Sequence, residues 1–270
     1  MRKRLKGSWL VVACSVGVVM LFVGCGTGGS EAPNSGIEEP SKPTAEACAF
    51  SALSQHLADE EGKVSTKRDK APQPGIYSYA MAGKQVVPGG ALRVKNLPSH
   101  SELFVTPART SGSKSCFRIQ MRFSPDIANT STYVIRGEDV YLVSLLSQAL
   151  GESQEITPNP PVLSASGSGS KWSGQFGGRT YGGYSFSALG KRTFQIGNNE
   201  VRTAGISSSV SYRGAFNGTQ AVTAWIALRP NPHIVVSEEL ESRQDFGVST
   251  LKINAHSHLM SLTPKQGSES

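Results

Sequence analysis

The sequence of 270 residues lacks the short motifs that accompany the common catalytic sites. It has no G-x-S-x-G serine turn, no Walker A loop, no H-E-x-x-H zinc motif, and no G-x-G-x-x-G between a strand and a helix. Two S-x-x-K matches, at Ser111–Lys114 and Ser168–Lys171, lie in Gly/Ser-rich stretches that do not begin a helix. We therefore expect no enzyme activity, no cofactor and no metal site.

Charged residues are also scarce, at 17% of the chain, and the net charge is +7. Four of the basic residues, Arg2, Lys3, Arg4 and Lys6, lie at the N-terminus and leave the remainder close to neutral. Binding to nucleic acid needs many Lys and Arg side chains to neutralise phosphates. This balance excludes nucleic acid as an expected partner.

A long hydrophobic run is missing too, because the uncharged stretch Trp9–Gly24 has 16 residues and a membrane-spanning helix needs roughly 20. Such a run after a basic start is typical of a secretory signal peptide, which we assign to residues 1–24. It ends in Leu21–Cys25, which resembles a bacterial lipobox, with a small Gly24 before the cysteine that is lipidated. We expect Cys25 to carry the lipid, palmitate included, and to anchor the chain on the extracytoplasmic face of the cell membrane. The alternatives are an uncleaved anchor and an ordinary signal peptide.

Cysteine is rare, with four in the chain, and two of them belong to the leader and the lipidation site. The remaining Cys48 and Cys116 form an even pair in a chain exported to an oxidising compartment. A disulfide between them is the favoured interpretation, and two separate buried thiols are the alternative.

Residues 25–44 are rich in Gly, Ser, Glu and Pro and predict a flexible tether. Helical spacing of apolar residues then predicts one amphipathic helix over Ala45–Leu57. From Ile76 onward the alternation of apolar and polar residues has the period of β-strands. Residues 45–264 are expected to form a single β-rich domain, and residues 265–270 a disordered tail.

The strands predicted by this alternation follow one another with short connections, which favours an antiparallel meander. They are Tyr77–Met81, Ser101–Thr106, Phe117–Phe123, Thr132–Ile135, Val140–Leu146, Tyr181–Leu189, Arg192–Ile196, Val201–Tyr212, Thr219–Leu228, His233–Ser237 and Leu251–His256. Asn217–Gly218 predicts a tight hairpin turn. The expected fold is mainly β, a large curved antiparallel sheet like a half-barrel around the helix, with a two-sheet sandwich as the alternative.

Several short segments resemble a family of uncharacterised β-rich lipoproteins common in actinobacteria. They include Pro74–Tyr79, Leu103–Pro107, Ser115–Cys116, Gly190–Arg192 and Thr223–Trp225. More distantly, a helix followed by an antiparallel meander is similar to the LolA/LolB-type half-barrel, over about Pro72 to Pro264. The family pattern implies a further cysteine after Cys116, and Thr132–Arg136 contains none, which leaves Cys48 as the available partner. The half-barrel resemblance implies only the binding of acyl chains.

Two functions follow from these observations. The first is a non-enzymatic lipoprotein that holds a lipid or other apolar ligand in the concave face of the sheet, in a pocket lined by Phe50, Leu53 and Trp225. The second is an envelope structural or protein-interaction module without a small ligand. His256 and His258 share one face of a strand and predict a solvated face, since no third metal ligand is apparent.

Overall fold

The computed structural model describes residues 71–87, 93–107, 115–124, 127–136, 139–149, 152–156, 158–159, 162–164, 171–176, 180–214, 217–229, 231–245 and 250–266. The predicted signal peptide, tether and Ala45–Leu57 helix lie outside these residues, as do Cys25, Cys48, Phe50 and Leu53. Within the described ranges the chain forms strands and no helix, so no described helix could cross a membrane.

Fifteen strands are described, and they all belong to one antiparallel sheet. The first group is β1 (Gly75–Val87), β2 (Arg93–Asn96), β3 (His100–Pro107), β4 (Ser115–Ser124), β5 (Ile127–Arg136), β6 (Asp139–Ala149), β7 (Glu152–Ile156), β8 (Pro158–Asn159) and β9 (Val162–Ser164). The second group is β10 (Lys171–Phe176), β11 (Thr180–Ile196), β12 (Asn199–Gly214), β13 (Asn217–Arg229), β14 (Val235–Asp245) and β15 (Thr250–Leu259). The predicted mainly β fold with a large curved meander sheet is confirmed.

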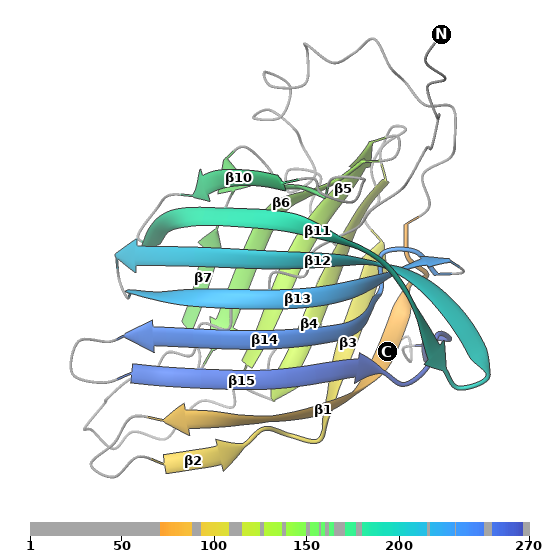
Figure 1. Ribbon diagram of the computed structural model, residues 1–270, viewed down its shortest axis with the longest axis horizontal. Helices are drawn as coiled ribbons and strands as arrows, with labels where there is room; N and C mark the ends of the chain where they lie inside the picture. The colour runs from red at the N-terminus through yellow and green to blue at the C-terminus, as the bar shows by residue number, and fades with distance from the viewer. Residues whose placement is uncertain are drawn as a thin grey trace, which may run out of the picture.

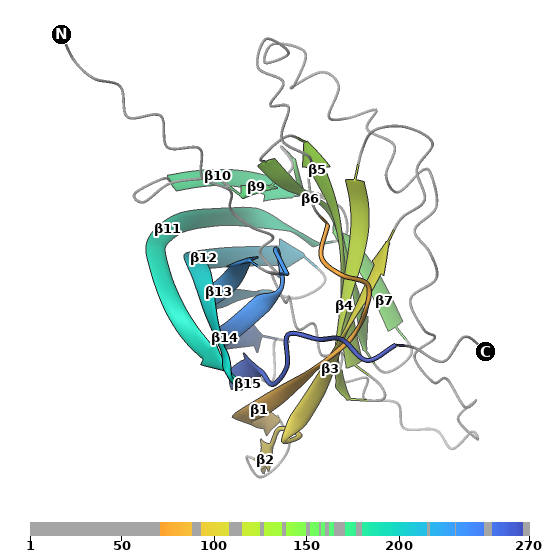
Figure 2. The same cartoon turned by 90° about the vertical axis from the view of Figure 1, so that its right-hand side faces the viewer.

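The strand order is β7-β6-β5-β4-β3-β1-β15-β14-β13-β12-β11-β10-β8, with β2 paired to β1 and β9 to β6. Two meanders therefore run in opposite directions from β1, which pairs with both β3 and the last strand, β15. Figure 1 shows β10 to β15 with β1 as one layer and β3 to β7 crossing obliquely behind it. Figure 2 shows the sheet curling round its inner face. The described strands form a single continuous sheet, so the alternative prediction of a sandwich of two separate sheets is wrong.

The core lies between the two layers, on the inner face of the curled sheet. Large side chains of both meanders are fully buried there, among them Tyr77, Tyr79, Phe117, Tyr133 and Ile206. The rings of Phe117 and Tyr133 stack with centroids 5.2 Å apart. The hydroxyl of Tyr79 donates a hydrogen bond to the backbone carbonyl of Val235 at 2.7 Å and ties β1 to β14. The described part of the inner face therefore carries large side chains that are shielded from solvent.

Two details of the second meander differ from the sequence prediction. Tyr181–Leu189 and Arg192–Ile196 are one long strand, β11, with a bulge between Ala188 and Gly190. Asn217 and Gly218 already belong to β13, where Gly218 pairs with Tyr212, so the predicted turn at Asn217–Gly218 is wrong. A Cβ atom at Gly218 would lie 2.6 Å from the Tyr212 ring and 2.3 Å from the carbonyl oxygen of Arg243. Glycine is needed at this position because it lets the Tyr212 ring and the Arg243 carbonyl pack closely within the sheet, not because it forms a turn.

Candidate functional site

The outer face of the second meander is polar and carries small side chains in register across the strands. Serines pair directly from strand to strand, as Ser173 with Ser185 and Ser185 with Ser209. Beyond Ser209 the same row continues through Ala221, Glu241, Asn254 and Lys84. Neighbouring strands are about 4.8 Å apart, so this row of eight positions, including Asn96 on β2, spans roughly 30 Å.

A first pocket of about 440 Å³ opens over β10, β11 and β12. Six of the seven residues that line it are serines, and the set is Ser173, Ser185, Phe186, Ser187, Ser207, Ser208 and Ser209. A hydroxyl group both donates and accepts hydrogen bonds. The pocket therefore offers many hydrogen bonds and little charge.

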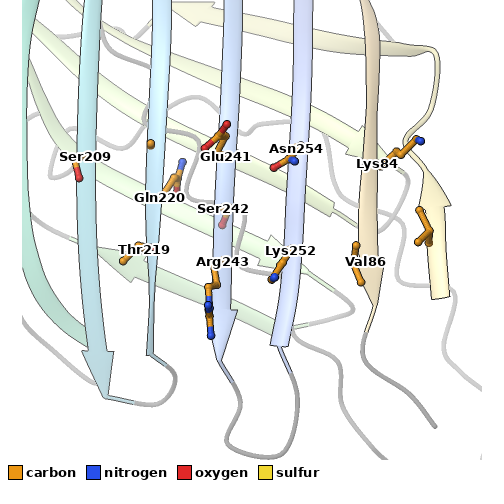
Figure 3. A pocket seen from close by; sticks show the side chains of 12 residues that line it. Lys84, Val86, Ser209, Thr219, Gln220, Glu241, Ser242, Arg243, Lys252 and Asn254 are labelled. Atoms are coloured by element: carbon orange, nitrogen blue, oxygen red, sulfur yellow. The ribbon is translucent and has the colours of Figure 1, made fainter. Parts of the chain in front are cut away.

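A second pocket of about 620 Å³ continues from the first across β12, β13, β14, β15, β1 and β2. Figure 3 shows the side chains that line it, most of them labelled. The full lining is Lys84, Val86, Val94, Ser209, Thr219, Gln220, Ala221, Glu241, Ser242, Arg243, Lys252 and Asn254. Ser209 lines both pockets, so they adjoin at this residue, and we call the two together the outer groove.

Charges of both signs lie at the β14 to β1 end of the outer groove. Arg243 pairs with Lys252, and Glu241 pairs with Asn254. Asp245 forms an ion pair with Arg243, with the Arg243 Nε and the Asp245 Oδ1 3.4 Å apart. The same Oδ1 accepts a 2.6 Å hydrogen bond from the Thr250 hydroxyl. The Thr250 bond, with the smaller effect of the Arg243 charge, lowers the pKa of the Asp245 carboxyl. The lining at this end carries Lys84, Arg243 and Lys252 against Glu241, so it is net positive and offers both donors and acceptors.

Trp225 lies on this same outer face, beyond the first pocket, which we call the serine pocket. It alternates along β13 with the fully buried Ala224 and Ile226, which point to the inner face. The Trp225 ring contacts Phe194 with centroids 5.9 Å apart, and the Arg192 guanidinium is 4.9 Å and 5.7 Å from the Phe194 and Trp225 ring centroids. The expectation that Trp225 lines a pocket in the concave face is therefore wrong.

The histidine face is solvated, as predicted. His256 and His258 are exposed on β15, with ring centroids 5.9 Å apart, and Glu239 pairs with His256 from β14. Among the described residues, no three His, Cys, Asp or Glu side chains are grouped so that they could hold a metal ion.

The sequence did not predict that two ionisable groups, Tyr79 and Glu238, lie close together on the inner face. Glu238 on β14 is only 6% exposed. Burial raises the pKa of Tyr79 well above its usual value, and the nearby Glu238 carboxylate adds to this. The outer-face serines were also missed, although their alternation at Ser185–Ser187 and Ser207–Ser211 is visible in the sequence.

The cysteine predictions remain open. Cys116 is buried in β4, 3% exposed. Because Cys25 and Cys48 lie outside the described residues, lipidation and the disulfide stay predictions. The pocket residues Phe50 and Leu53 lie outside the described residues as well.

No protein-family model and no curated protein matches this chain. Among solved structures, a candidate lipoprotein from Parabacteroides distasonis ATCC 8503 is similar at a TM-score of 0.36 and 10% identity, over 71% of this chain and 96% of the other. The hypothetical lipoprotein YmcC from Escherichia coli K12 is similar at a TM-score of 0.27 and 13% identity, over 79% and 99%. At these values the likeness fixes neither function nor site, and the resemblance to an actinobacterial family stays a prediction.

Proposed function

We propose that this chain is a membrane-anchored, extracytoplasmic lipoprotein without enzyme activity that binds an extended polar chain of the cell envelope in its outer groove. The anchor rests on the lipobox-like Leu21–Cys25 sequence. The binding rests on one observation: two polar pockets on the outer face adjoin at Ser209.

The chemistry of the outer groove suits a polar and elongated ligand. Its β10 to β12 end is lined mainly by serine, whereas a sheet face selected for strand stability favours β-branched and aromatic residues. Its β13 to β1 end adds charged and amide side chains, so a polar chain can form hydrogen bonds at successive strands. Such a ligand fits the role of an envelope interaction module, the second of the two functions derived from the sequence.

The first of those functions, a lipid in the concave face, receives less support. An acyl chain needs unfilled apolar volume, and at the described positions the interior is occupied by Tyr77, Tyr79, Phe117 and Tyr133. Trp225, the one described residue of the predicted lipid pocket, points to the opposite face.

The test is binding of the full chain, purified in detergent, to envelope polymers. The probes are insoluble peptidoglycan sacculi in co-sedimentation, and a neutral glycan, a polyuronate and a Gly/Ser peptide in solution. Ser209→Trp fills the junction of the two pockets and should abolish binding to the polymer that the wild-type chain holds. Ser211→Trp is the matched control, because Ser211 is exposed on the same strand and face and does not line either pocket. Equal binding by wild-type and Ser209→Trp chains, or no binding to any polymer, contradicts the proposal.

A further inference from the structure

We infer that the polar chain is a glycan and that Trp225 is the platform on which one of its sugar rings stacks. This inference rests on the proposed function, because it names the ligand class of the outer groove. It depends on the way the protein places an indole ring beside the serine pocket.

The Trp225 ring lies directly over Gly205, its register partner on β12. A Cβ atom at position 205 would stand 2.7 to 2.9 Å from three carbon atoms of the six-membered ring, closer than real Cβ contacts. Only glycine at this position lets the indole settle onto the sheet backbone. The ring is therefore held close to the sheet while Trp225 keeps part of its surface exposed.

Phe194 and Arg192 also contact the Trp225 ring and hold it in place. Phe194 meets it at an interplanar angle of 53°, and the exposed Arg192 spans the rings of Phe194 and Trp225. An aromatic ring that is ordered before binding loses little entropy when a ligand stacks on it. Arg192 adds guanidinium donors beside the exposed part of the indole.

The platform adjoins the serine pocket. Ser207, which lines that pocket, is two residues from Gly205 on the same face of β12, a separation of about 7 Å. Thr223 stands between Trp225 and the row of Ala221 on β13. A ligand that covers the indole and enters the pocket therefore spans neighbouring units of one chain.

This combination matches a sugar more closely than a peptide or a nucleic acid. A pyranose ring has a face of C–H groups, which carry partial positive charge and are attracted to the electron-rich face of an indole. Its edge carries hydroxyl groups, for which the serine hydroxyls are reciprocal donors and acceptors. A nucleic acid would need cations at its phosphates, and the lining of the serine pocket contains none.

The experiment measures binding of the detergent-purified full chain to an array of bacterial and β-linked glycans, followed by titration of the bound glycan with tryptophan fluorescence. Wild-type fluorescence should change on binding. Trp225→Ala should weaken binding by about tenfold or more, as expected for truncation of a central aromatic contact. Trp225→Tyr should recover part of the affinity, since it restores a stacking surface. Tyr181→Ala is the control, because Tyr181 is a 55% exposed aromatic residue on β11 outside both pockets.

A second variant guards against a folding defect in Trp225→Ala. Gly205→Ala keeps the tryptophan and displaces its ring from the sheet, and it should weaken glycan binding at an unchanged circular dichroism spectrum. If Ser209→Trp abolishes binding while Trp225→Ala and Gly205→Ala bind normally, this inference is overturned and the proposed function stands. If a peptide binds and no glycan does, the inference falls in the same way. If Ser209→Trp has no effect either, both fall.

Discussion

Replacement of Tyr79 by phenylalanine tests whether β1 and β14 are tied together across β15 as the structure shows. Tyr79 is fully buried on β1, and its hydroxyl donates a 2.7 Å hydrogen bond to the carbonyl of Val235 at the start of β14. Phenylalanine retains the ring and its packing but removes the donor. The change therefore isolates one buried hydrogen bond between strands that are not neighbours in the sheet.

The expected loss can be estimated from that contact. A typical intramolecular hydrogen bond contributes about 0.5–1.5 kcal/mol net, and a buried acceptor left without its donor costs about 1–3 kcal/mol. We expect the free energy of unfolding to fall by about 1.5 kcal/mol. For a domain of this size that corresponds to a decrease in Tm of roughly 3–6 °C.

The measurement is urea unfolding of the full chain in non-ionic detergent, followed by tryptophan fluorescence, with thermal unfolding alongside. Tyr181→Phe is the control, since Tyr181 is 55% exposed and its hydroxyl is not enclosed by the protein. That variant should differ from wild type by less than about 0.5 kcal/mol. A Tyr79→Phe chain as stable as Tyr181→Phe would show that the hydrogen bond between β1 and β14 does not contribute to stability.

Three further predictions concern ionisation and the cysteines. Burial raises the pKa of Tyr184 and of Tyr212 to about 12 in the folded chain. The unfolded chain therefore loses these protons first, at about pH 10. The free energy of unfolding should keep its full value below pH 10 and fall as the pH rises from 10 to 12. Unfolding by urea between pH 9 and pH 12 checks this, and a flat profile contradicts it. Cys25→Ser should abolish labelling by a fatty-acid analogue and release the protein from the membrane; label retained on the variant would refute lipidation at Cys25. The denatured, unreduced chain should show no free thiol at Cys48 or Cys116, and their bond should contribute on the order of 4 kcal/mol in the chain-entropy model.

The period of the apolar residues predicted most of the long strands and their faces, although β10 was missed and β14 runs over Val235–Asp245 rather than His233–Ser237. Leu251, Ile253 and Ala255 do point inward on β15, and Lys252, Asn254 and His256 point outward. This succeeded because strand periodicity is local, set by the alternation of side chains along one strand. It also indicated an antiparallel meander, since successive strands were separated by short connections.

The candidate site could not be predicted in the same way, because it depends on register between strands. Ser173, Ser185 and Ser209 form a row only once three strands pair, and nothing in one strand specifies that alignment. Trp225 was assigned to a pocket in the concave face because its strand is apolar on both faces and carries small alanine residues that would leave space. Its position in β13, between Ala224 and Ile226, placed it on the other face, where Gly205 leaves room for the ring.

The pairing of the first described strand with the last one has a consequence for the order of assembly. Tyr79 on β1 pairs with Leu259 on β15, so this ladder joins residues near opposite ends of the described chain. The hairpins on either side can form early, whereas one edge of β1 stays open until β15 pairs with it. An open edge is a template for pairing with another chain. The folding chain is therefore most exposed to aggregation just before β15 docks, and a chaperone that covers β1 would act in that interval.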